Sequence, residues 1–294
     1  MFKRKKYKLR LPSRTLVLGE RTLVMGILNI TPDSFSDGGR YLDTETAFAR
    51  ALEIERQGAD LLDIGGESTR PGSEGVSVQE ELRRVIPVLE KLLGHLKIPV
   101  SIDTSKPEVA EAALYQGAEI INDVTGLRAD PRLAEIAASR KVPIILMHMR
   151  GEPRTMQKKP FAREMMRDIV GGLRHAVAVA RRAGVAKSQI VIDPGIGFGK
   201  KLEQNFELLA RLPELARLGF PMLVGASRKS FVGKVLGGAP SNERVWGTAA
   251  TVAASILGGA HIVRVHDVAE MVQVARVADA IANPGAVAAR LASQ

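Results

Sequence analysis

The sequence contains no cysteine, which excludes disulfide bonds, cysteine-ligated zinc and a thiol nucleophile. It also lacks a long apolar run: its most apolar window, residues 248–257, is too short to span a bilayer. A basic stretch at residues 3–6 is not followed by the apolar segment that a secretory signal requires. A cytoplasmic enzyme is therefore our expectation.

Aromatic residues are scarce, at 4% of 294 residues, whereas positive charge is in excess, with a net charge of +10. A basic chain can bind nucleic acid, or it can attract small anionic substrates. The lysines and arginines are scattered, with few aromatic residues between them, and this pattern favours small anions. Salt-dependent binding to arbitrary DNA would support the alternative.

Eight short apolar runs rich in Val, Ile and Leu recur along the chain. Because they do not alternate with polar residues, they are typical of strands buried on both faces of a parallel sheet. The runs are residues 22–28, 60–64, 99–102, 119–121, 143–147, 190–192, 221–224 and 261–265.

The segments between these runs have helical periodicity. Ser77 and Glu80 form a capping-box pattern, and Pro87 within the helix that follows predicts a kink or weakens the helix prediction. Pro107 suits a first helical turn, and Gly117 suits a helix end. Further helices are expected around residues 44–57, 131–139, 161–183, 201–217, 242–257 and 268–282.

Strands that alternate with helices predict a parallel sheet. Eight such units, with no linker rich in Pro and Ser between them, favour an α/β fold of the closed (β/α)8 TIM-barrel type over an open doubly wound sheet. We expect a single domain over residues 1–294. Within it, residues 1–20 form an N-terminal extension with a short hairpin that plugs the bottom of the barrel.

Each apolar run ends in polar residues that a core does not need. In a parallel barrel the carboxyl ends of all strands lie on one face, where the active sites of this fold are built. These residues are Asn29, Asp63, Glu67, Asp103, Asn122, Asp123, His148, Asp193, Ser227, Arg228, Lys229, Arg264, His266 and Asp267.

A polar residue at a strand end can instead cap the next helix or form a turn, and for any single residue this alternative has equal weight. Ser105, ahead of Pro107, is expected to be such a cap. The alternative does not explain Arg264, which lies within an apolar run and would be costly to bury without anionic partners.

Two glycine-bearing loops, residues 31–39 and 65–75, suit mobile lids, although glycine content does not distinguish a lid from a plain loop. The stretch GIGFGK at residues 195–200 lacks the spacing of nucleotide-binding motifs. No set of residues has clear metal-ligand spacing, and no GxSxG nucleophile motif occurs.

Taken together, the motifs resemble the signatures of dihydropteroate synthases, in order and with no departure at a motif position. The resemblance extends from about residue 15 to about residue 285. The motifs are MGILNITPDSFSDGG (25–39), DIGGESTRPG (63–72), SIDT (101–104), INDV (121–124), DPGIGFGK (193–200), GASRKSF (225–231) and RVHDV (264–268).

The resemblance implies a pterin-binding barrel that condenses (7,8-dihydropterin-6-yl)methyl diphosphate with 4-aminobenzoate, giving 7,8-dihydropteroate and diphosphate in folate biosynthesis. It implies that Asp103, Asn122 and Asp193 bind the pterin ring, whose N–H groups suit carboxylate and amide acceptors. Lys229 would reach the carbonyl and N5 side of the ring. Met147 is interpreted equally well as the pocket floor or as a core residue.

For the diphosphate, the resemblance implies Arg264 and His266, with Thr69 nearby and Mg²⁺ at Asn29. Magnesium commonly binds through few protein ligands plus phosphates, so the missing metal cluster is no objection. The diphosphate would leave a carbocation-like methylene that the aryl amine attacks, without a covalent enzyme intermediate.

The 4-aminobenzoate ring would lie between Phe35, Pro71 and Phe198, with its carboxylate at the backbone N–H of Ser230. Arg70 and Asp37, on the two lids, would complete the site. The resemblance thus implies the catalytic set Lys229, Arg264, His266, Asp37 and Arg70. It also implies a homodimer packed through late helices.

Two other classes remain open from the sequence. A corrinoid-linked methyltransferase barrel would share the Asp103, Asn122 and Asp193 pocket but would not need the STRPG and SRKS segments found here. A non-catalytic pterin-binding protein should lack Arg264 and His266, and both are present.

Overall fold

The computed structural model describes residues 4–31, 40–68, 73, 75–151, 156 and 164–285, except for the side chains of residues 40–43. Its centre is an eight-stranded parallel sheet in the order β8-β7-β6-β5-β4-β3-β10-β9. The strands are β3 (Leu23–Asn29), β4 (Leu61–Gly65), β5 (Val100–Asp103), β6 (Ile120–Asp123), β7 (Ile144–Met147), β8 (Ile190–Asp193), β9 (Leu223–Val224) and β10 (Ile262–Val265).

The two end strands of this sheet meet, so that the sheet is nearly closed. Ile192 in β8 forms a parallel bridge with Met222, just before β9, and its N–H donates to the carbonyl of Pro221 at 3.0 Å. Every predicted apolar run overlaps one of the strands, whose apolar residues are buried between the neighbouring strands and the helices outside. The predicted (β/α)8 barrel is confirmed.

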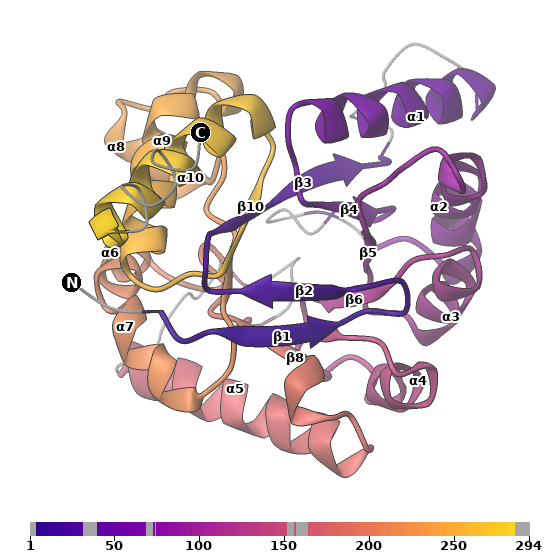
Figure 1. Cartoon of the computed structure of the whole chain (residues 1–294), viewed down its shortest axis with the longest axis horizontal. Helices are drawn as coiled ribbons and strands as arrows, with labels where there is room; N and C mark the ends of the chain where they lie inside the picture. Colours follow the sequence, from indigo (N-terminus) through magenta and orange to yellow (C-terminus); the bar gives the residue numbers. More distant parts are fainter. Residues whose placement is uncertain are drawn as a thin grey trace.

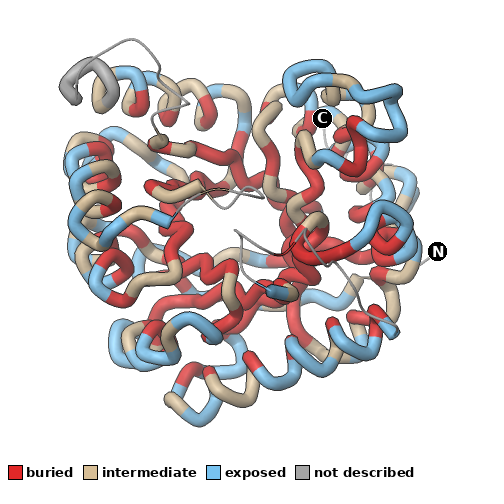
Figure 2. Tube along the Cα trace, turned by 180° about the vertical axis from the view of Figure 1, so that it is seen from behind, coloured by how far each residue is buried: buried red, intermediate tan, exposed pale blue. Residues whose placement is uncertain are grey.

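Helices surround the sheet, with buried inner faces and exposed outer faces (Figures 1 and 2). Short 3-10 turns lie at Lys187–Gln189, Ala216–Leu218 and Ser241–Glu243. The α-helices are α1 (Arg40–Arg56), α2 (Val78–Leu92), α3 (Pro107–Tyr115), α4 (Arg132–Arg140), α5 (Met165–Arg182), α6 (Leu202–Ala210), α7 (Leu212–Leu215), α8 (Ser230–Val235), α9 (Val245–Leu257) and α10 (Val268–Ala282).

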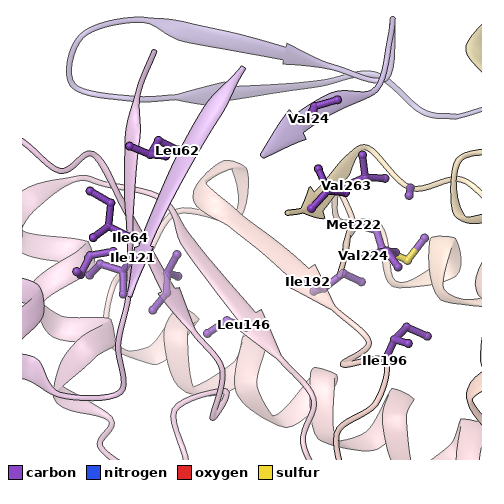
Figure 3. Packing of buried hydrophobic residues seen from close by; sticks show 14 of the residues in the cluster. Val24, Leu62, Ile64, Ile121, Leu146, Ile192, Ile196, Met222, Val224 and Val263 are labelled. Atoms are coloured by element: carbon purple, nitrogen blue, oxygen red, sulfur yellow. The ribbon is translucent and has the colours of Figure 1, made fainter. Parts of the chain in front are cut away.

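The largest hydrophobic core lies between the sheet and the helices. Strand residues such as Ile64, Ile121 and Ile192 have no exposed surface and pack with apolar helix residues (Figure 3). Burial of this apolar surface is the main stabilising contribution, about 25 cal/mol per Å². It fixes the strands and hence the side chains at their carboxyl ends.

A hairpin of β1 (Tyr7–Arg10) and β2 (Thr15–Leu18) crosses the other end of the barrel (Figure 1). Leu9 and Leu18 on it are 1% and 0% exposed. They pack on residues at the amino ends of the strands: Leu23, Met25, Leu61, Ile120, Ile145, Val191, Leu223 and Ile262. The expected plug is confirmed, and it closes the end opposite the polar residues.

Several local predictions need correction. Pro87 does not end α2, which continues to Leu92, so the helix prediction needed no weakening there. Ser105 does not cap α3: the N-cap is Lys106, whose N–H instead donates to Thr104 Oγ1 at 3.2 Å. The segment 201–217 is not one helix, because it breaks at Arg211, and Pro213 lies in the first turn of α7.

Other local predictions hold. The Ser77 side chain accepts the N–H of Glu80 at 3.2 Å, as a cap of α2. The other half of the predicted capping box is replaced, because the Glu80 carboxylate bonds Arg83 and Arg84 within the helix instead of reaching back to Ser77. Gly117, just after α3, has the left-handed φ of 94° that ends a helix without a Cβ penalty. Across the described residues, no helix has the length and apolar character to cross a membrane.

Candidate active site

Polar side chains gather at the carboxyl ends of the strands. Register places Asp103 beside Asn122 and Met147 beside Asp193, so residues far apart in sequence become neighbours across the sheet. Asn29 is the last residue of β3. Lys229 and Ser230 follow β9, as the N-cap and first residue of α8. The strand-end prediction is therefore confirmed for these residues.

Arg264 lies at the centre of this end and binds carboxylates from two strands. Its Nε donates to Asp63 Oδ2 at 2.6 Å, and its Nη2 donates to Asp103 Oδ2 at 2.7 Å. Asn122 Nδ2 also donates to Asp63 Oδ2, at 3.0 Å. A buried guanidinium requires anionic partners, and the structure supplies them, as the sequence indicated.

Burial of this cluster changes how its carboxyl groups ionise. Burial raises the pKa of Asp103 to about 7, and the neighbouring Asp63 carboxylate also raises it, while Arg264 acts in the opposite direction. Burial raises the pKa of Asp193 to about 6, against the lowering effects of the Gly195 N–H and Lys229. The site therefore contains two carboxyl groups that titrate near neutral pH.

The loop after β8 places an aromatic ring beside a cation. The Lys229 Nζ lies 4.0 Å from the centroid of the Phe198 ring, a cation–π distance. Gly197 has φ of 85°, and a Cβ there would lie 3.1 Å from Lys229 Cδ. Gly195 donates its N–H to Asp193 Oδ1 at 2.7 Å. The loop thus connects the Asp193 carboxylate to the Phe198–Lys229 pair.

Phe198 also forms one wall of a small apolar cluster with Val124, Met147, Met149 and Met156. Met147 is 3% exposed and pairs in register with Asp193. The side chain therefore contributes to the core and stands next to the polar cluster at once, so both interpretations of Met147 from the sequence fit its position.

His266 is held by Ser227. The His266 N–H donates to Ser227 Oγ at 3.2 Å, and the same Oγ lies 3.0 Å from His266 Nδ1. Burial, followed by Arg264 and Arg228, lowers the pKa of His266 to about 3, so the imidazole is neutral. Because Oγ already accepts one proton, its own hydroxyl can donate to Nδ1, which leaves Nε2 protonated and able to donate.

The segment that carries Ser227 is itself fixed by ionic and backbone contacts. The Arg228 guanidinium forms an ion pair with Asp267, and Arg228 N–H donates to Thr248 Oγ1 at 3.0 Å. Arg244 Nη1 donates to the Arg228 carbonyl at 2.9 Å. Arg228 has a positive φ of 56°, which these contacts maintain. The backbone leading into Lys229 and α8 is therefore held in place.

The start of the loop after β4 is anchored by a buried ionic network. Lys106 Nζ contacts Glu67 and donates to Glu81 Oε2 at 2.5 Å, where Glu81 has no exposed surface. Arg84 Nη1 donates to the Gly66 carbonyl at 2.8 Å. Glu67 in the second motif therefore positions the loop, which is a structural role.

Several site residues expected from the sequence lie outside the described residues. These are Phe35, Asp37, Thr69, Arg70 and Pro71. Among described side chains, no group of three or more His, Asp or Glu is arranged to hold a metal ion. A hollow of about 490 Å³ lies at the opposite end, between Tyr7, Arg217 and His261, and so is separate from the polar cluster.

The sequence indicated three further residues only by position. Asp63 was placed at a strand end without a role, yet it binds both Arg264 and Asn122. His148 and Lys200 are 8% and 4% exposed and contact each other. The signal for Asp63 was the predicted need of Arg264 for anions; no sequence signal showed that Lys200 is buried.

Comparison with known proteins identifies the family. Residues 25–266 match the family described as pterin binding enzyme. The chain is 53% identical over 263 residues to the dihydropteroate synthase of Synechocystis sp., covering 90% of this chain and 91% of that protein. The chain belongs to the dihydropteroate synthase family. It is thereby a transferase of folate biosynthesis, and the resemblance found in its motifs is confirmed.

Solved structures of the dihydropteroate synthase family have the same fold. The Xanthomonas albilineans enzyme with 4-aminobenzoic acid aligns with a TM-score of 0.88 at 44% identity, covering 95% of this chain and 99% of that one. The same enzyme in complex with 7,8-dihydropteroate aligns with a TM-score of 0.85 at 43% identity, covering 94% and 99%.

Proposed function

We propose that this chain condenses (7,8-dihydropterin-6-yl)methyl diphosphate with 4-aminobenzoate, releasing 7,8-dihydropteroate and diphosphate. The observation that carries this proposal is the buried Arg264–Asp63–Asp103 cluster beside Asn122 and Asp193, in a member of the dihydropteroate synthase family. Side chains with the chemistry to accept from a pterin and to attract a diphosphate lie together at one end of the barrel, which supports the proposal.

The pterin ring is assigned to Asp103, Asn122 and Asp193. Each is at most 6% exposed, so each carboxylate or amide oxygen is a strong acceptor in surroundings of low polarity. A pterin edge presents several N–H donors, which match these acceptors. The site should therefore bind a pterin more tightly than other rings, because a ring without these N–H donors would leave the buried acceptors unpaired.

The diphosphate is assigned to Arg264 and His266, with Thr69 as a further contact, and Lys229 is assigned to the carbonyl and N5 side of the pterin ring. The neutral His266 can donate from Nε2, while Arg264 supplies positive charge. Donors and cations fixed around the leaving group stabilise the charge that develops on it as the C–O bond breaks. A Ser227 hydroxyl that donates to Nδ1 leaves the proton of the neutral ring on Nε2, the tautomer that this role requires.

One residue of the described site, Asn29, has the chemistry of a magnesium ligand. Asn29 ends β3 and offers an amide oxygen, the hard donor that Mg²⁺ prefers, and the diphosphate oxygens would supply further ligands. Asp63 and Asp103 are already bonded to Arg264, so they do not form a second cage. When bound, the ion would add positive charge at the leaving group.

The aryl amine is assigned to the Phe198 side of the site, with Phe35, Pro71 and Arg70 as further proposed contacts. Phe198 offers an aromatic face beside Lys229 for the ring of the amine substrate. The backbone N–H of Ser230, the first residue of α8, is proposed to bind the carboxylate of that substrate. After the C–O bond breaks, the amine nitrogen attacks the methylene carbon, a C–N bond forms and the amine releases a proton. Asp37 is proposed to stabilise the developing cation.

The proposed function is tested by mixing the purified chain with dihydropterin diphosphate, 4-aminobenzoate and Mg²⁺. We expect equal amounts of 7,8-dihydropteroate and diphosphate, measured by liquid chromatography and a phosphate assay. Pterin binding without product would support a non-catalytic protein instead. Product formation that needs a corrinoid protein and a methyl donor would favour the methyltransferase alternative.

Pterin affinity is expected to fall as pH decreases from 8 to 5. Asp103 and Asp193, with pKa values raised to about 7 and about 6, lose acceptor capacity when they bind protons. For each carboxyl group that binds a proton, the association constant for the pterin falls by at most about tenfold per pH unit. Calorimetric titration with a 6-substituted pterin measures this, and Asp193→Asn should show a shallower pH dependence. Constant affinity over this range would contradict the assignment.

The same raised pKa values have the opposite effect on the stability of the ligand-free protein. Both carboxyl groups bind protons in the folded state at pH values where the unfolded chain has released them. Their contribution to the free energy of unfolding is therefore complete below about pH 4 and is lost as pH rises through about 6 to 7. Denaturation of wild type and Asp103→Asn between pH 5 and 8 separates this contribution from other groups.

We also propose that the chain is a homodimer that packs through its late helices. Figure 1 shows α6, α8, α9 and α10 gathered on one side of the barrel. Large apolar side chains on these helices are exposed, and such a patch marks an interaction surface. They are Leu202, Phe206, Val235, Leu236, Trp246, Val277 and Ile281.

Trp246→Arg is expected to convert the dimer into monomers. Trp246 is 78% exposed on α9, and a charge there would be buried without a partner in the dimer. Tyr115→Arg is the matched control, since Tyr115 is also 78% exposed but lies on α3, across the barrel. Light scattering after gel filtration measures the mass. A monomeric wild type, or a dimer that survives Trp246→Arg, would contradict this interface.

A further inference from the structure

Lys200 directs its ammonium group into the protein beneath the loop that follows β8. The residue is only 4% exposed. Its Nζ donates to the carbonyls of Gly195 at 2.7 Å and Phe198 at 3.2 Å, and lies 3.3 Å from His148 Nδ1. An ammonium group has three donors, so these contacts account for all of them.

Lys200 contacts the His148 ring on the side away from the loop, and neighbouring groups hold this ring in place. Burial lowers the pKa of His148 to about 3, so its neutral ring can accept from Lys200 at Nδ1, and its Nε2 lies 3.5 Å from Asp168 Oδ2. A Cβ on Gly172 would lie 2.6 Å from His148 Cδ2, so α5 holds the ring. Lys200 therefore connects the loop to a fixed point on β7 and α5.

The loop backbone lies against the end of β7 so closely that side chains do not fit. A Cβ on Gly195 would lie 1.9 Å from the His148 carbonyl oxygen, and one on Gly199 would lie 2.2 Å from the Arg150 carbonyl oxygen. Both glycines have positive φ. Glycine adopts this conformation without strain and so permits the close approach, and Lys200 supplies two of the contacts that hold the loop there.

The two site groups attached to this loop depend on Lys200 to different extents. Asp193 belongs to β8, and pairing with Met147 fixes its backbone, so the loop contributes only the Gly195 N–H bond to its carboxylate. Phe198 lies outside helices and strands, and its carbonyl is bonded directly to Lys200. Its ring in turn lies beneath Lys229.

Burying a lysine is costly, which indicates a specific use. The pKa of Lys200 is lowered to about 7, chiefly by burial. The carboxylates of Asp193 and Asp168 act to raise it, and the positive charges of Lys229 and Arg128 act to lower it. A methionine of similar length would fill the same space without this cost. The ammonium group therefore does something that an apolar side chain would not.

We propose that Lys200 is a positioning residue that holds the Phe198 ring beside Lys229 and thereby determines the affinity of the site for the aryl amine. The inference rests on the proposed function for the identity of that substrate. It differs from the assignment of Lys229 and Phe198, because Lys200 lies behind the loop and touches neither substrate.

The test compares Lys200→Met with Lys8→Met, which removes the same charge from the exposed face of the hairpin. We expect Lys200→Met to raise KM for 4-aminobenzoate by about tenfold or more, while KM for the pterin diphosphate changes by less than about threefold. Lys200→Gln retains amide donors and should give an intermediate value. A loss of folded protein alone would lower kcat and leave both KM values unchanged.

Equal changes in the two KM values, or a change in kcat alone, would overturn the proposal. If Lys200→Met does not fold, the ratio of the two KM values in Lys200→Gln decides. If neither variant folds, Lys200 has a general structural role and the positioning proposal fails. Absence of product from both wild type and Lys8→Met would instead refute the proposed function.

Discussion

We expect Arg264→Ala to reduce turnover by about a thousandfold or more and to destabilise the folded protein by about 3 kcal/mol. The loss of turnover follows from removing a fixed cation at the proposed diphosphate position. The loss of stability follows because Asp63 and Asp103 remain buried without their partner. Steady-state product formation and chemical denaturation measure the two effects on the same preparation.

Two further variants separate these effects. Arg21→Ala removes a guanidinium from the more exposed ion pair with Asp60, and it should cost less than about 1 kcal/mol and leave turnover intact. Combining Arg264→Met with Asp63→Asn and Asp103→Asn removes the buried charges together, so stability should recover while activity does not. Near-wild-type turnover in Arg264→Ala would refute the assignment of this arginine.

Lys229→Ala is expected to lower kcat/KM by about a hundredfold or more with a small change in stability. The ammonium group lies 4.0 Å from the Phe198 ring, where the proposed pterin and aryl amine meet, so both substrates lose a contact. Because Lys229 is the N-cap of the short helix α8 and forms no side-chain cap, its truncation leaves that helix intact.

Lys234→Ala is the control for Lys229, since it removes an exposed lysine from the same helix and should leave kcat/KM within about twofold of wild type. Rapid-quench measurement of product isolates the chemical step from product release. If Lys229→Ala retains full activity while Arg264→Ala does not, the pterin and aryl amine contacts assigned to Lys229 must be withdrawn.

The barrel and much of its polar end could be predicted from the sequence. Strands buried on both faces leave uninterrupted apolar runs, and Arg264 within such a run required carboxylates that the fold then supplied. The hairpin plug followed from the short segment ahead of the first run. The motif resemblance supplied the pterin residues, and membership of the family is now established.

What could not be predicted depends on contacts between distant segments. Nothing near Asp63 in the sequence shows that it binds residues 201 and 59 positions away, Arg264 and Asn122. Lys200 looks like an exposed lysine, because its burial depends on His148 and on the close approach of glycines to β7. The break at Arg211 comes just ahead of Pro213, which lies in the first turn of α7, and helical periodicity over 201–217 alone does not show it.

Three parts of the sequence interpretation stay predictions. They are the single-domain division, the cytoplasmic location and the site roles of Phe35, Asp37, Thr69, Arg70 and Pro71. The prediction that the two loop motifs carrying these five residues are lids rests on glycine content and length alone. Their proposed contacts with the aryl amine and diphosphate follow from the resemblance. Single substitutions in the same product assay can rank them against Lys229 and Arg264.

A crystal structure of the chain with a dihydropterin diphosphate analogue and Mg²⁺ tests the central claim most directly. The account predicts the pterin ring within hydrogen-bond distance of Asp103, Asn122 and Asp193, with the diphosphate against Arg264 and His266. A pterin bound elsewhere, for example in the hollow beside Tyr7 and His261 at the plugged end of the barrel, would contradict it.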